Sequence, residues 1–237
     1  MTDVAELYLA VRAKEQRIYT DEVVARLPDV PAEHPHRVEW SVRRASANRL
    51  VAYFGGRPEP LRILDLGCGN GWLSAALARL PGARVYGVDT NLLELTQAAR
   101  VFKAQDQAAF LAADVFQPPF REGGFDAIVL ASSVQYFDDV RALLLALRPL
   151  LSPDGEVHII DSHFYEENEV EDARNRSEAY YRGLGYSEMA ACYHHHRWSE
   201  LDGYTVGILH DPSAPKAKLF RKLGKADSPF PWLRLTF

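Results

Sequence analysis

Three glycines at alternate positions, Gly67, Gly69 and Gly71, follow a short apolar run and precede a helix-like pattern. Such glycines let the backbone turn sharply and approach a ligand closely, and a helix that begins there offers free N–H groups to that ligand. Asp65 stands two residues before the first glycine, where its carboxylate would repel a pyrophosphate. Trp72 occupies the position where a dinucleotide fingerprint needs a small residue. The pattern therefore favours a ligand that carries a positive charge over a nicotinamide dinucleotide.

Strand-like and helix-like patterns alternate on both sides of this loop. Alternation of this kind requires crossover connections and predicts a doubly wound, mostly parallel α/β sheet. Two late apolar runs predict an antiparallel pair at the sheet edge, which makes a seven-stranded sheet with an antiparallel last strand. The predicted strands are 61–66, 84–88, 110–112, 125–131, 155–161, 204–209 and 232–237, and the predicted helices are 71–80, 92–103, 140–150 and 216–223.

The flanks of this region have a different character. Residues 1–27 are predicted to be helical, and a second helix is predicted over 37–54, before Gly55 and Gly56. We therefore predict an N-terminal helical cap over residues 1–58 and a main domain over 59–237. Residues 163–200 are polar and rich in tyrosine, and they are predicted to form a helical lid insertion. The cap residues expected to help close the ligand site are Trp40, Arg43 and Arg44.

Composition narrows the class of protein. The net charge of −5 and the pI near 5.9 disfavour a broad surface for nucleic acid. The apolar runs are too short to span a membrane, and Asp3 and Glu6 stand where a secretory signal would be basic and then apolar. Two cysteines, Cys68 and Cys192, can build neither a disulfide framework nor a CxxC metal site. We therefore expect a cytoplasmic protein.

Several ordered motifs together resemble the class I methyltransferases that use S-adenosylmethionine. The segment 64–71, Leu-Asp-Leu-Gly-Cys-Gly-Asn-Gly, is similar to the first motif of that family. The further matching segments are Val88-Asp89, Ala113 to Val115, Phe125 to Ser133 and Leu150 to Glu156. The resemblance covers residues 61–161. It implies a Rossmann-like fold, S-adenosylmethionine as cofactor and S-adenosylhomocysteine as product.

The resemblance also implies roles for individual residues. Asp89, followed by Thr90, would bind the ribose, Asp114 and Val115 would hold the adenine, and Ala131 would accept from the methionine ammonium. The implied cofactor-binding residues are Asp65, Gly67, Cys68, Gly69, Asp89, Thr90, Asp114, Val115 and Ala131. Cys68 is expected to be a small packing residue of the loop, because nothing in the sequence would activate it as a nucleophile. Purely structural roles are the alternative for the aspartates, which could cap helices or brace turns.

The acceptor side has fewer signals. Methyl transfer is a direct displacement, so proximity and orientation should supply most of the acceleration. The candidate catalytic residues are Tyr136 and His163, which follow the fourth and fifth predicted strands and could act as a base or contact the acceptor. A histidine titrates near neutral pH, so His163 is a plausible base. The alternatives are packing under the lid for Tyr136 and an exposed loop position for His163. One histidine of the run 194–196 could line the acceptor pocket, and no metal site is expected there.

These observations lead to a small-molecule methyltransferase that needs no metal and no membrane, with nucleic acid as an unlikely partner. Two alternatives stay open. The basic stretch 216–225 would suit an RNA or protein methyltransferase. An intact cofactor site would also serve a non-catalytic module that binds S-adenosylmethionine or S-adenosylhomocysteine and regulates a partner.

Overall fold

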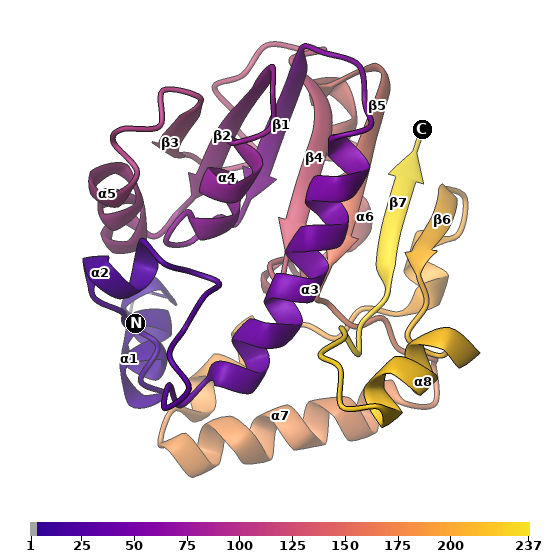
Figure 1. Cartoon of the computed structure of the whole chain (residues 1–237). Coiled ribbons are helices and arrows are strands. Elements are labelled where there is room, and N and C mark those ends of the chain that lie inside the picture. The colour runs from indigo at the N-terminus through magenta and orange to yellow at the C-terminus, as the bar shows by residue number, and fades with distance from the viewer. Residues whose placement is uncertain (1–3) are drawn as a thin grey trace.

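A seven-stranded sheet forms the centre of the molecule (Figure 1). The computed structural model describes residues 4–237, so the first three residues of the predicted helix 1–27, Asp3 among them, lie outside the described residues. The strand order is β3-β2-β1-β4-β5-β7-β6, and β7 runs antiparallel to both β5 and β6. The strands are β1 Leu61–Leu66, β2 Ala83–Asp89, β3 Ala108–Ala112, β4 Phe125–Ala131, β5 Leu151–Ile160, β6 Thr205–His210 and β7 Trp232–Thr236. The predicted fold class is thereby confirmed.

Eight α-helices and four short 3-10 helices surround the sheet within residues 4–237. The α-helices are α1 Val4–Lys14, α2 Asp21–Val24, α3 Arg37–Phe54, α4 Trp72–Leu77, α5 Leu92–Val101, α6 Val140–Leu147, α7 Val170–Leu184 and α8 Pro215–Lys222. The 3-10 helices are η1 Val134–Tyr136, η2 Arg148–Leu150, η3 Ser187–Cys192 and η4 Trp198–Leu201. In this part of the chain no helix is both long and apolar enough to cross a membrane.

The prediction of one continuous helix over residues 1–27 is wrong. Gln16 has a left-handed backbone with φ 57°, and the Arg17 amide bonds back to the Arg12 carbonyl, which ends the helix. The Glu15 carbonyl lies 2.8 Å from His36 Nε2 instead of receiving a helical N–H. A contact with a distant residue therefore divides the predicted helix into α1 and α2.

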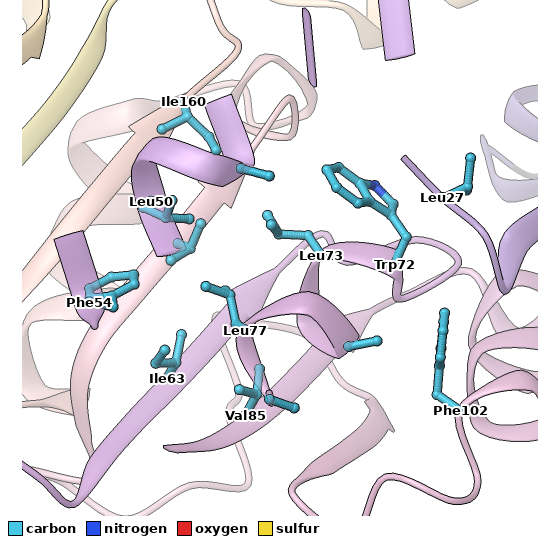
Figure 2. Close-up of a cluster of buried hydrophobic side chains, with 14 of the residues drawn as sticks. Leu27, Leu50, Phe54, Ile63, Trp72, Leu73, Leu77, Val85, Phe102 and Ile160 are labelled. Atoms are coloured by element: carbon cyan, nitrogen blue, oxygen red, sulfur yellow. The ribbon is translucent and has the colours of Figure 1, made fainter. Parts of the chain in front are cut away.

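Neighbouring strand residues point to opposite sides of the sheet, and helices cover both sides. Both faces of the sheet are therefore buried. Figure 2 shows one of the two clusters, in which Leu50 and Phe54 of α3 and Leu73 and Leu77 of α4 gather near Ile63 of β1. A second cluster, built largely from α6 and the other faces of β4 and β5, covers the opposite side. The sheet is therefore held rigidly, and its strand ends are fixed in space.

A third, smaller cluster lies apart from the sheet. Leu7 and Val11 of α1 pack against Tyr181 of α7 and Met189 of η3, and all four side chains are buried. The N-terminal helix is therefore attached to the segment that follows β5, and in Figure 1 α1 lies beside one end of α7. We call this group of residues the lid cluster.

Candidate functional site

A cavity of about 740 Å³ lies at the carboxyl ends of β1, β4 and β5, beneath α1, α3 and α7. The predicted site residues that line it are Asp65, Gly67, Cys68, Gly69, Ala131, Tyr136 and His163. Of the predicted cap residues, Trp40 and Arg43 also contribute to the wall. Arg44 lies outside the described lining and pairs with Asp29 at 2.7 Å, so its expected role in closing the site is not supported.

The glycine loop has the conformation that its sequence predicts. Gly67 and Gly71 both have φ 75°, which L side chains rarely adopt. A Cβ on Gly67 would lie 2.5 Å from Ser133 Cβ, and one on Gly71 would lie 2.4 Å from a ring carbon of Phe110. The Gly67 amide donates to the Val88 carbonyl at 2.8 Å, which holds the loop against β2. Close packing therefore requires these glycines, in addition to any requirement of a ligand.

The remaining predicted cofactor residues lie at the neighbouring strand ends, outside the described cavity lining. Asp89 ends β2, and its carboxylate accepts from the amides of Gly69 and Asn91, both at 2.8 Å. It therefore braces the glycine loop, and its oxygens retain further lone pairs for a ligand. Thr90 follows it and is exposed.

The segment after β3 lies beside Asp89, since the Ala113 amide donates to the Asp89 carbonyl at 3.3 Å. Asp114 is exposed and accepts from the Phe116 amide at 2.9 Å, the geometry of a local turn. Val115 is buried, with 5% of its surface exposed. The residues implied for ribose and adenine thus stand together at one edge of the sheet, next to the glycine loop.

Two buried carboxylates border the loop on the cavity side. Burial raises the pKa of Asp65 to about 6, although the Ser74 hydroxyl, which donates to it at 2.6 Å, partly opposes this shift. Burial also raises the pKa of Glu94, and the nearby Arg12 guanidinium partly opposes that shift. A buried carboxylate is stabilised by a positive charge beside it. This end of the cavity therefore suits a ligand with a cationic group.

Arg12 supplies the opposite charge at the same end. Its contact with Glu94 is 3.4 Å long, and its Nε atom is buried without a hydrogen-bond partner in the described structure. Together with Asp65, it makes this end of the cavity complementary to a small molecule that carries both an ammonium and a carboxylate.

The far end of the cavity is aromatic. The Tyr136 ring packs edge-on against Tyr8 at 5.6 Å and Tyr193 at 5.9 Å between centroids. Although 41% of the Tyr136 surface is exposed, desolvation by its neighbours raises the pKa of its phenol, which is therefore neutral at physiological pH. The His163 ring lies 4.3 Å from the Tyr165 ring between centroids.

Partial burial lowers the pKa of His163, and the Arg176 guanidinium lowers it further, while Glu169 opposes the shift. The imidazole is therefore neutral at physiological pH and can accept a proton. Arg176 and Tyr165 both line the cavity with it.

His194 is the member of the histidine run that lines this cavity. His195 pairs with the Ser177 hydroxyl at 2.9 Å, and His196 lies between the Glu200 carboxylate and the Val134 carbonyl. Within residues 4–237, no group of three His, Cys, Asp or Glu is placed to hold a metal ion.

Asp161 is a site residue that the sequence motifs did not predict. This buried residue follows β5, lines the cavity and accepts from Ser46 at 2.5 Å and Ser228 at 3.0 Å. Asp161 and Ser132, at adjacent strand ends, have φ values of 52° and 56°. Such conformations cost about 1–3 kcal/mol and cluster at functional sites. The position of Asp161 at the end of a predicted strand could have indicated a site residue. Its partners Ser46 and Ser228, however, lie far away in the sequence.

An α/β sheet with a glycine loop and an aspartate at the ends of β1 and β2 defines a nucleotide-cofactor-binding domain. The family model described as a methyltransferase domain matches residues 63–155. A 2-phytyl-1,4-naphtoquinone methyltransferase of Trichormus variabilis is 37% identical over 152 residues, which cover 61% of this chain and 66% of that protein. A demethylmenaquinone methyltransferase of Thermus thermophilus is 38% identical over 104 residues, 43% of this chain and 47% of that protein. This chain therefore spans less than two thirds of the length of each.

Solved structures agree on the fold. The YcgJ protein of Bacillus subtilis superposes with a TM-score of 0.59 at 17% identity, over 81% of this chain and 96% of that one. Residues 63–155 therefore match a methyltransferase domain, and the sheet around them has the class I methyltransferase fold, whose cofactor is S-adenosylmethionine. The charges at the loop end of the cavity fit that molecule, whose amino-acid part carries an ammonium and a carboxylate.

Proposed function

We propose that this protein transfers the methyl group of S-adenosylmethionine to a small-molecule acceptor. The proposal rests on one observation: one continuous cavity joins the glycine loop to an aromatic chamber beneath α1 and α7. The bound cofactor supplies an activated methyl group. The acceptor atom forms a bond to the methyl carbon as the carbon–sulfur bond breaks, so S-adenosylhomocysteine leaves with the electron pair. A protonated acceptor also releases one proton.

The chain's own residues would hold the reactants and exclude water. Asp89 and Thr90 would bind the ribose, Asp114 and Val115 the adenine, and Ala131, with its backbone carbonyl, the ammonium group. Asp65 and the loop residues Gly67, Cys68 and Gly69 would face the methionine part. These roles follow the family resemblance, and the charges of the loop support them.

On the acceptor side, His163 is the proposed base, because its neutral imidazole faces the same cavity. Tyr136 is proposed as a wall that orients the acceptor, since its neutral phenol and its two edge-on tyrosine contacts favour positioning over proton transfer. Alignment of the reacting atoms would supply most of the acceleration.

A small acceptor is favoured because helices cover the chamber. We propose that residues 1–58 act as a cap and residues 163–200 as a lid, because α1, α3 and α7 all contribute to the cavity wall. The basic stretch 216–225, which would suit a nucleic acid, contributes no described residue to that wall. The two cysteines are free, as is usual for proteins of a reducing compartment, so we propose a cytoplasmic location.

Methyl transfer to a panel of acceptors, followed by mass spectrometry, tests the proposal. Two related enzymes are named for quinone substrates, so reduced naphthoquinones belong in the panel beside simple phenols, carboxylic acids and amines. A product heavier by one methylene unit, together with S-adenosylhomocysteine, is the expected result. Tight binding of S-adenosylhomocysteine without transfer to any acceptor would favour the regulatory module.

A further inference from the structure

Arg12 is held by fewer polar contacts than Arg100, which also connects the N-terminal segment with α5. Its contact with Glu94 is a single one of 3.4 Å, and its buried Nε has no partner among the described residues. By contrast, Arg100 on α5 holds Asp21 with two contacts of 2.6 and 2.8 Å. A guanidinium binds a carboxylate best through two parallel N–H groups. Arg12 therefore has donor capacity that its protein surroundings do not use.

The unused capacity lies at the glycine loop. Arg12, Gly69 and Glu94 line the same cavity, and a Cβ on Gly69 would lie 3.3 Å from the Glu94 carboxylate that Arg12 contacts. Glu94 is buried and 20% of the Arg12 side chain is exposed, so water screens the charges of this pair only in part. A ligand that reaches this loop with a carboxylate would meet the guanidinium there.

Arg12 also belongs to a helix that is attached to the lid. Leu7 and Val11, on the same helix, pack into the lid cluster with Tyr181 of α7 and Met189 of η3. Tyr8 of this helix forms part of the aromatic chamber through its contact with Tyr136. A bond between Arg12 and a ligand at the loop would therefore tie the cofactor end of the cavity to the walls of the acceptor end.

We propose that Arg12 binds the carboxylate of the cofactor's methionine part, and that the cofactor thereby fixes α1 and the lid over the acceptor chamber. This inference rests on the proposed function, since it requires S-adenosylmethionine as the ligand. Arg12 acts as a positioning residue: it orders the chamber and does not take part in bond making. The acceptor would accordingly bind after the cofactor, to a chamber that the cofactor has completed.

Calorimetric titration with two ligands tests the first half of the proposal. S-adenosylhomocysteine carries the carboxylate, whereas its decarboxylated analogue keeps the ammonium, the thioether and the adenosine. We expect Arg12→Gln to weaken binding of S-adenosylhomocysteine at least tenfold and to leave binding of the analogue within about twofold. Arg12→Lys, which keeps the charge without the two-pronged geometry, should lie between them.

Arg100→Gln is the matched control, because Arg100 also joins the N-terminal segment to α5 but lies outside the described cavity lining. It should leave the ratio of the two affinities unchanged. An equal loss for both ligands in Arg12→Gln, or no loss for either, would overturn the proposal. Failure of the unaltered protein to bind either ligand would instead refute the proposed cofactor function.

Hydrogen exchange tests whether the cofactor fixes α1 and the lid, which is the second half of the proposal. S-adenosylhomocysteine should slow amide exchange in residues 4–14 and 170–184 of the unaltered protein by at least fivefold. The decarboxylated analogue should protect the glycine loop but not these two helices, and S-adenosylhomocysteine should fail to protect them in Arg12→Gln. Equal protection of both helices by the two ligands would show that the carboxylate does not hold the lid, and the proposal would fall.

Discussion

Replacing Asp65 by asparagine should make the ligand-free protein more stable at neutral pH. Asp65 is 1% exposed, and a buried carboxylate prefers to be protonated. Its pKa rises from 3.8 to about 6 on folding, so the folded state holds this proton more tightly than the unfolded state does. The group therefore costs no stability below about pH 4, and its cost grows as the pH rises through the folded pKa.

The size of the stability gain follows from the pKa shift of Asp65. About two pH units at ~1.4 kcal/mol per unit correspond to roughly 3 kcal/mol at pH 7. Asparagine has the same shape, and its carbonyl can still accept from the Ser74 hydroxyl, but its amide hydrogens need partners that the buried site does not supply. We therefore expect a net gain of about 1–3 kcal/mol at pH 7–8.

Urea unfolding at pH 4, 6 and 8 checks this expectation. The difference in unfolding free energy between Asp65→Asn and the unaltered protein should increase with pH by about 2–3 kcal/mol over this range. Ser74→Ala is the matched control, since it removes the hydrogen bond that favours the ionised form and should destabilise the protein more at pH 8 than at pH 4. A difference that does not vary with pH would refute the reasoning. The same variant should bind S-adenosylhomocysteine at least tenfold more weakly, because the buried negative charge is kept for the ligand's ammonium.

Three further predictions concern the loop, the ribose site and the acceptor side. Gly71→Ala should destabilise the fold by about 2–4 kcal/mol in urea unfolding, because its Cβ would lie 2.4 Å from the Phe110 ring at a φ of 75°. Asp89→Ala should abolish calorimetric binding of S-adenosylhomocysteine, and retained affinity would reduce Asp89 to a brace for the loop. His163→Asn should lower the transfer rate to a protonated acceptor by about 10²-fold or more. Because the pKa of His163 is lowered, the unaltered enzyme should lose activity only on the acid side of about pH 6.5, and the variant should lack this loss.

The central sheet could be predicted because its signals are local. The strand Phe125–Ala131 and the helix Arg37–Phe54 have the predicted bounds, since a continuous apolar run and a helical period ending at glycines describe them completely. Helix α4, predicted over 71–80, is shorter at Trp72–Leu77. Strand β5 begins at Leu151 instead of 155, because Leu151 pairs with Phe125 across a register shift that no periodicity reveals.

The site residues also fall into those that local motifs predict and those that depend on tertiary packing. The glycine loop and the strand-end acids could be predicted because each stands in a short motif next to the element that positions it. Arg12 and Glu94 could not be predicted, since they are 82 residues apart and their contact depends on how α1 settles on the lid. Asp161 was missed for the same reason, because its partner Ser46 is 115 residues away.

The two ends of the cavity differ in how firmly they are held. The cofactor end of the cavity is built from strand ends that two large buried clusters hold. The proposed acceptor end is built largely from α1, α7 and η3, which within residues 4–237 are joined by the small lid cluster. Exchanging Tyr181 or Tyr193 would therefore alter the chamber with little effect on the glycine loop. An enzyme of this design can change its acceptor while it keeps its cofactor. The motifs therefore identify the methyl donor, and the acceptor has to be argued from the packing of the lid.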